Sequence, residues 1–139
     1  MLFRSSNYRE IYDEVVVSGI DSLLEQNYDL QSILEFLDEY GPASFSYYED
    51  YVDAGYDFYF DPVDAFLRSA RADWDALSDF GRVYLGEFSD PEDMAMAFHD
   101  EGPYNCDIPH YLEIDWRATA GNLIGDEVWN VGEYYFRYN

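Results

Sequence analysis

The sequence contains no lysine, a single cysteine and no long apolar run. The lone Cys106 excludes a disulfide within the chain and is typical of a reducing compartment, and we interpret it as a passive small residue rather than a catalytic thiol. No stretch approaches the roughly 20 apolar residues of a membrane span, and the N-terminal residues lack the apolar core of a signal peptide. We therefore expect a cytoplasmic protein.

All seven basic residues are arginine, and they stand against 30 acidic residues, so the formal net charge is −23 over 139 residues. Such a charge opposes compaction by self-repulsion, and it repels nucleic acid and anionic lipid surfaces. The acids run from Glu10 to Glu133 instead of forming a tail. We expect neither nucleic acid nor a membrane as a partner.

The motifs of common catalytic and metal sites are missing as well. There is no P-loop, no dinucleotide-binding glycine pattern and no nucleophile elbow. His99 and His110 lie eleven residues apart, which is no metal-ligand spacing, and the four-residue recurrence of Asp53, Asp57 and Asp61 differs from a calcium-binding loop. Among 30 acids, glycosidase-like pairs arise by chance. The sequence therefore predicts no enzyme, no cofactor and no metal site.

Aromatic residues are abundant, at 20% of the chain, which favours a folded core over disorder. They are densest in residues 47–62, YYEDYVDAGYDFYFDP, where seven Tyr or Phe and five acids occur without one basic residue. The main question that the sequence raises is which kind of surface requires aromatic rings and carboxylates together.

Apolar spacing predicts helices in the first half of the chain. One covers 8–16 and is interrupted at Ser18-Gly19, and a second begins after Asp29 as the N-cap and stops at Gly41-Pro42. A short helix is expected from Ser44 or Ser46 to Gly55.

Asp61-Pro62 is typical of an N-cap followed by proline at the first helical position, and the helix it opens is expected to bury residues from Val63 to Leu77. In the second half, the sequence predicts a strand over 82–88, helices after Asp90-Pro91 (to Gly102) and after Asp115, and a terminal hairpin through Gly132.

These elements predict an α+β fold, with a small helical N-terminal part followed by a mixed α/β C-terminal part that ends in a β-hairpin, in an elongated acidic molecule. The mildest seam, near Ser78 to Gly81, divides the chain into a mostly helical acidic domain, residues 1–80, and an α+β domain, residues 81–139.

The acids suggest a polyanion mimic. Acids three or four residues apart on a helix lie about 5–6 Å from one another, on the scale of a DNA backbone that rises ~3.4 Å per nucleotide. A row through Asp50, Asp53, Asp57 and Asp61 would show this spacing, and 23 net charges equal those of roughly 12 base pairs. The alternative is a salt-adapted acidic scaffold without DNA competition, although salt adaptation does not call for extra rings.

Three segments resemble the ArdA family of antirestriction proteins. They are VYLGEFSDPEDMAMAF (83–98), IPHYLEIDWRATAGNL (108–123) and the closing YYFRY (134–138). The match covers roughly residues 47–139. Where the family's last helix often carries Arg-Asp, this chain has Gly121-Asn122.

The resemblance implies a mimic of bent B-form DNA that occupies the DNA-binding groove of a type I restriction-modification enzyme in a bacterial host, commonly as an elongated dimer. It also implies a shortened member without the family's first domain. The predicted function is thus an inhibitor of a DNA-binding defence enzyme, with an anti-CRISPR protein as the alternative within this class. The predicted partner-binding residues are Glu49, Asp50, Asp53, Asp57, Asp61, Asp64, Asp73, Asp75, Asp79, Glu87, Asp90, Glu92 and Asp93.

Overall fold

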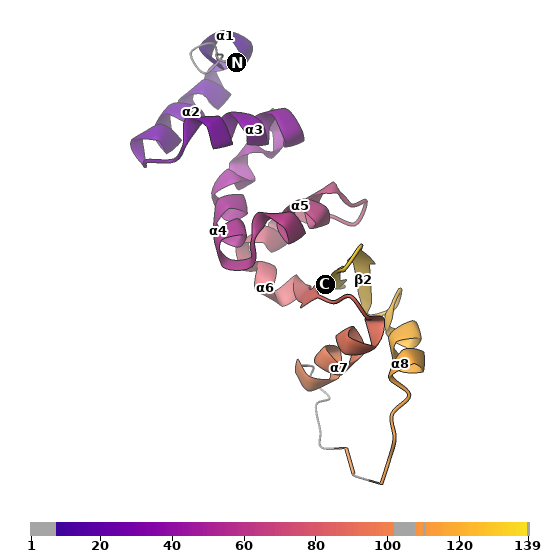
Figure 1. Ribbon diagram of the computed structural model, residues 1–139. Helices are drawn as coiled ribbons and strands as arrows, with labels where there is room; N and C mark the ends of the chain where they lie inside the picture. Colours follow the sequence, from indigo (N-terminus) through magenta and orange to yellow (C-terminus); the bar gives the residue numbers. More distant parts are fainter. Residues whose placement is uncertain (1–7, 102–107, 110, 139) are drawn as a thin grey trace. The chain divides into compact units, whose positions relative to one another are not determined.

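The structure is a computed structural model, and it describes residues 8–101, 108–109 and 111–138. Helices and a three-stranded antiparallel sheet give an α+β fold, which confirms the predicted class (Figure 1). The chain packs into two compact units, Met1–Val52 (unit 1) and Asp53–Asn139 (unit 2). No helix in the described ranges has the length and apolar character needed to cross a lipid bilayer.

Unit 1 is helical. Its elements are α1 (Tyr8–Ile11), α2 (Glu14–Glu25), α3 (Leu30–Tyr40), the 3-10 helix η2 (Pro42–Tyr47) and the start of α4 (Tyr48–Phe58). Ile20 of α2 and Ile33 of α3 are fully buried. The ring of Phe36 meets that of Tyr48 edge-on at 5.2 Å between centroids, so aromatic packing fixes α3 against the start of α4.

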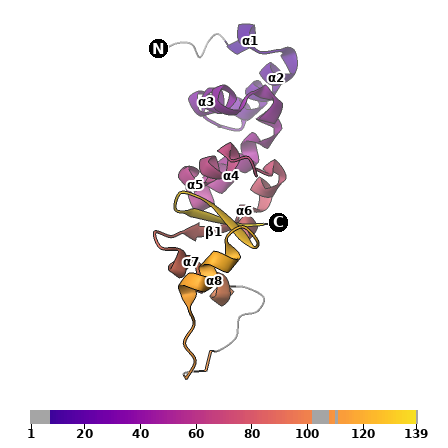
Figure 2. The same cartoon turned by 90° about the vertical axis from the view of Figure 1, so that its right-hand side faces the viewer.

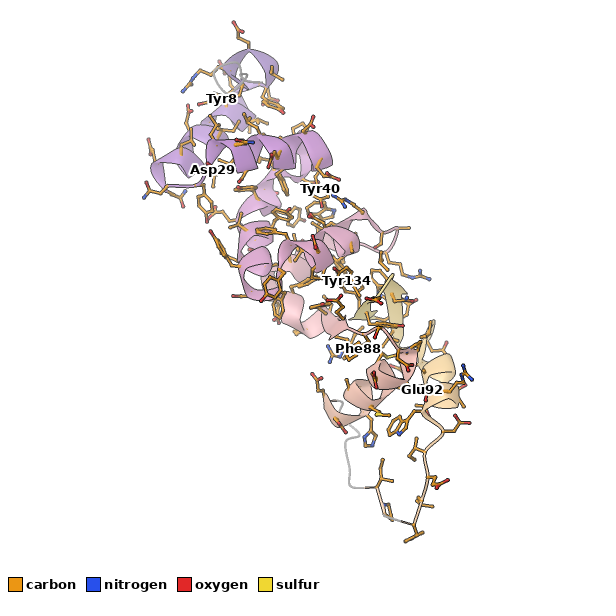
Figure 3. The ribbon with its side chains drawn as sticks, viewed as in Figure 1. Tyr8, Asp29, Tyr40, Phe88, Glu92 and Tyr134 are labelled. Atoms are coloured by element: carbon orange, nitrogen blue, oxygen red, sulfur yellow. The ribbon has the colours of Figure 1, made fainter. Side chains whose placement is uncertain are left out.

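Two aspartates cap helices α2 and α3 of unit 1. Asp29, labelled in Figure 3, accepts a hydrogen bond from the Ser32 amide at 2.9 Å, which confirms the predicted cap of α3. The predicted helix over 8–16 is wrong, because Asp13 caps a new helix by accepting from the Val16 amide at 3.0 Å. This helix, α2, continues through Gly19, where an added Cβ would lie only 2.8 Å from the Phe45 ring. Gly19 therefore admits a ring instead of ending a helix.

Unit 2 contains the remainder of α4, α5 (Phe60–Arg68), the 3-10 helix η3 (Trp74–Asp79), α6 (Phe80–Val83), β1 (Tyr84–Glu87), α7 (Pro91–Glu101), α8 (Trp116–Leu123), β2 (Val128–Val131) and β3 (Tyr134–Arg137). The strand order is β1-β3-β2. Strands β2 and β3 form the predicted hairpin, and its turn passes through Gly132 at φ +57°.

Helices cover both faces of this sheet. On one face, Trp129 and Phe136 are cross-strand partners with ring centroids 4.7 Å apart, and Phe66 of α5 packs on both. Tyr135 points the opposite way because side chains alternate along a strand, and it packs in a cluster with residues of α7 and α8 such as Met94. Helices α7 and α8 lie side by side (Figure 1, Figure 2).

The predicted starts of α7 and α8 are confirmed. Asp90 accepts from the Glu92 amide at 2.9 Å, and Asp115 accepts from the Ala118 amide at 3.0 Å. The predicted end of α7 at Gly102, like Cys106 and His110, lies outside the described residues.

The boundaries around the aromatic stretch differ from the prediction. Helix α4 runs through Gly55, because the absence of a side chain there admits the ring of Phe60. Helix α5 begins at Phe60 with Tyr59 as its N-cap residue, so Asp61 lies in the first turn and is not the cap. The helix ends at Arg68, so the predicted continuation to Leu77 is wrong.

The division into units also differs from the predicted seam at residue 80. The rings of Phe66 and Trp129 stack at 5.7 Å, and Phe66 lies 5.3 Å from Phe136. Helix α5 thereby belongs with the sheet, and the division falls between Val52 and Asp53. An amphipathic helix does not reveal from its own spacing which distant surface buries its apolar side.

Candidate partner-binding surface

The predicted partner-binding acids lie in, or directly before, five elements. Glu49 and Asp50 lie in α4 within unit 1, and the other eleven lie in unit 2: Asp53 and Asp57 in α4, Asp61 and Asp64 in α5, Asp73 before η3, Asp75 and Asp79 within it, Glu87 in β1, Asp90 before α7, and Glu92 and Asp93 in its first turn.

All thirteen carboxylates reach the surface. Ten are exposed, and Asp50, Asp64 and Glu92 are half-buried. No charged residue in the described ranges is buried. The fold therefore retains its acids in water, as the cost of burying an unpaired charge requires.

The predicted single row of acids is divided. Asp53 and Asp57 are one turn apart in α4, and Asp61 and Asp64 are one turn apart in α5. Tyr59, at φ +70°, lies between the two helices and redirects the chain. The structure thus keeps Asp50, Asp53 and Asp57 of the predicted row in one helix, and it places Asp61, together with Asp64, in the next helix.

Some of the predicted acids stabilise the fold. Asp73 accepts from the Asp75 amide at 3.1 Å and Asp90 caps α7, while Asp79 approaches the Arg82 guanidinium at 3.7 Å. Within the described part of the chain, Asp53 and Asp57 act neither as caps nor as ion-pair partners. Local stability therefore explains Asp73 and Asp90 but not the pair on α4.

Acids also surround the tyrosines of the sheet. Glu87 on β1 is the cross-strand partner of Tyr134 on β3, and Tyr134 is labelled in Figure 3. Burial raises the pKa of the Tyr134 phenol, and the charges of Glu87, Asp61 and Glu133 raise it further. Burial, followed by the charge of Glu87, raises the pKa of Tyr84 to about 12. Acids from α5 and β1 therefore act on one side of the sheet as a common negative field.

Rings near the paired acids remain in water. Tyr56 is 80% exposed and Tyr59 is 81% exposed, whereas Phe58 between them packs edge-on against Phe80 at 5.6 Å. The predicted partner-binding residues are acids alone and do not include these two tyrosines. No signal in the sequence separates these two rings from the buried ones, because their exposure depends on where the chain turns.

Two arginines already contact tyrosine rings within the molecule. The Arg9 guanidinium lies 5.2 Å from the Tyr8 ring centroid in unit 1, and that of Arg71 lies 5.6 Å from the Tyr138 centroid in unit 2. These are cation–π distances.

His99 is half-buried with its ring 5.8 Å from Trp116, and no cluster suited to a metal ion occurs among the described residues.

Comparison with known proteins gave no relative: no protein-family model matches the chain, and neither the curated proteins nor the solved structures provide a match.

Proposed function

We propose that the protein is a DNA mimic, an inhibitor without catalytic activity or cofactor that occupies the basic DNA-binding groove of a host defence enzyme. The primary target class is a type I restriction-modification enzyme, which rests on the ArdA resemblance of residues 83–98, 108–123 and 134–138. It acts in the cytoplasm of a bacterial host, with dimerisation as a further expectation.

The observation that carries the proposal is the surplus of surface carboxylates in both units. Unit 1 has 11 acids against two arginines, a formal charge of −9, and unit 2 has 19 against five, a formal charge of −14. Seven arginines cannot cancel 30 carboxylates, and no described acid is buried. A folded polyanion of this kind attracts a strongly basic surface.

The helical acid pairs add spacing to this charge. Residues four apart rise about 6 Å along a helix, which lies between one and two nucleotide steps of ~3.4 Å. Asp53 and Asp57 have this separation on α4, and neither has a structural role among the described residues. Carboxylates fixed on helices therefore present negative charges at a spacing similar to that of backbone phosphates.

Two other interpretations give different results. A CRISPR effector has a similarly basic channel and would bind the same surface. A salt-adapted scaffold would have no basic partner. Its acids would also require molar salt for folding, whereas a mimic folds in dilute buffer and binds there best.

The test is affinity capture from a bacterial lysate in low salt, followed by elution with duplex DNA. Release of a captured restriction enzyme by DNA, and its inhibition by the purified protein, supports the proposal. Capture that duplex DNA does not reverse, or a protein that unfolds below molar salt, contradicts it.

A further inference from the structure

The last turn of α4 displays one exposed aromatic ring and the residue between α4 and α5 displays another, where a folded protein would usually bury them. Tyr56 is 80% and Tyr59 81% exposed, and three chain steps keep their Cα atoms within roughly 11 Å. We name Tyr56 and Tyr59 the tyrosine pair. Both residues belong to unit 2.

Two other rings of this segment, Phe58 and Phe60, contact other residues of unit 2, so the exposure of the tyrosines does not reflect a loose segment. Phe58 contacts Phe80 at 5.6 Å and Tyr84 at 6.0 Å between centroids. Phe60 places its ring against the backbone of Gly55, where any side chain would collide with it. The turn therefore holds the two tyrosines on a supported backbone, which lowers the entropy lost when they bind.

Carboxylates flank the tyrosine pair in the sequence and on the surface. Asp53, Asp57 and Asp61 are exposed, and the stretch 47–62 contains no basic residue. An aromatic face attracts cations, and nearby carboxylates strengthen that attraction. The surroundings therefore select a cationic group over an apolar or anionic one.

The form of the cation follows from the rings. A guanidinium is planar and stacks on an aromatic face, whereas an ammonium is a compact, strongly hydrated charge. The molecule already uses this contact at Tyr8 with Arg9 and at Tyr138 with Arg71. Exposed tyrosine is also enriched among the residues that dominate protein interfaces, as is its partner arginine.

We propose that the tyrosine pair is an arginine-binding anchor. Tyr56 and Tyr59 stack on guanidinium groups of the partner's basic groove, and Asp57 and Asp61 form ion pairs with the same guanidinium groups. This inference rests on the proposed function and deepens it. Carboxylates alone attract lysine and arginine alike, whereas the rings make the protein prefer a groove rich in arginine.

The test is calorimetric titration of the full chain with oligoarginine and oligolysine peptides of equal length in low salt. We expect the wild type to bind oligoarginine more tightly. The double substitution Tyr56→Ala/Tyr59→Ala should weaken oligoarginine binding about tenfold and oligolysine binding little. Tyr56→Phe/Tyr59→Phe keeps the rings and should keep the preference, and Tyr111→Ala, at a tyrosine 75% exposed, is the matched control.

Circular dichroism establishes that each variant is folded, and the single substitutions Tyr56→Gln and Tyr59→Gly replace the double variant if it unfolds. Equal binding of both peptides by the wild type, or an equal loss for both in the alanine variant, overturns the anchor while leaving the polyanion proposal intact. Failure of the wild type to bind either peptide overturns both proposals. A wild type that is dimeric and an alanine variant that is monomeric also overturn the anchor, because the tyrosine pair would then join two copies of the chain.

Discussion

The indole of Trp129 and the ring of Phe66 stack with 5.7 Å between their centroids. This contact joins helix α5 to the C-terminal hairpin, two elements near opposite ends of unit 2 in the sequence. Phe66 also contacts Phe80 at 5.5 Å and Phe136 at 5.3 Å, and all four side chains are buried. The aromatic cluster around Phe66 is thus the link that makes residues 53–139 one unit.

Phe66→Ala should destabilise unit 2 by about 3–5 kcal/mol, because it removes a large buried ring and leaves a cavity. Hydrogen exchange in the full chain can resolve the effect by unit. Amides of β2 and β3 should exchange faster, and those of α3 should change much less. Equal acceleration in both units would contradict the division at residue 52.

Tyr59→Gly should stabilise the fold by about 1 kcal/mol. Tyr59 has φ +70° and ψ 152°, a backbone conformation that residues other than glycine rarely adopt. The strain at such a residue amounts to roughly 1–3 kcal/mol. Tyr56→Gly is the matched control, since this residue is equally exposed but lies within α4, where glycine costs about 1 kcal/mol. Opposite shifts in chemical denaturation midpoint confirm the prediction, and a loss in both variants contradicts it.

Alkaline pH should unfold the protein in a step linked to the sheet tyrosines. Burial raises the pKa of Tyr84 from 10.0 to about 12, so the folded state favours the neutral phenol. That contribution is complete below pH 10 and is lost as the pH rises towards about 12. Thermal melts over this range should show a smaller loss of Tm for Tyr84→Phe than for the wild type. Tyr111→Phe, which removes the hydroxyl of an exposed tyrosine, is the control variant.

Neutralising one surface acid should change inhibition little, whereas neutralising four should abolish it, because many weak long-range attractions share the binding. The informative set is Asp53→Asn, Asp57→Asn, Asp61→Asn and Glu87→Gln, none of which caps a helix. A control set of four exposed acids outside the predicted surface is Glu10, Glu14, Glu25 and Asp38, changed to the corresponding amides. Inhibition assays should show a smaller loss for the control set. A single substitution that abolishes binding in a folded variant would refute distributed charge.

The same experiment must spare the capping aspartates. Asp90→Ala should cost about 1 kcal/mol through loss of the hydrogen bond to the Glu92 amide, while Asp90→Asn keeps an acceptor and should remain close to wild-type stability. Thermal denaturation of the two variants separates the structural role of Asp90 from its charge.

Several features of this protein follow from the sequence alone. The charge of −23 requires only counting, and exposure of the acids follows because burial of unpaired carboxylates is too costly. The caps at Asp29, Asp90 and Asp115 depend on hydrogen bonds to amides two or three residues ahead, so local sequence suffices. The hairpin through Gly132 is equally local.

Tertiary structure decided the rest. Gly19 and Gly55 look like helix ends in the sequence, yet each accommodates an aromatic ring from a residue elsewhere in its own unit. Phe66 joins α5 to strands far along the chain, and no local pattern specifies that partner. Tyrosine composition likewise leaves open which rings are buried, because exposure depends on where the backbone turns and which surfaces meet. Burial is a property of the assembled unit, and so the outward position of Tyr56 and Tyr59 emerged only from the fold.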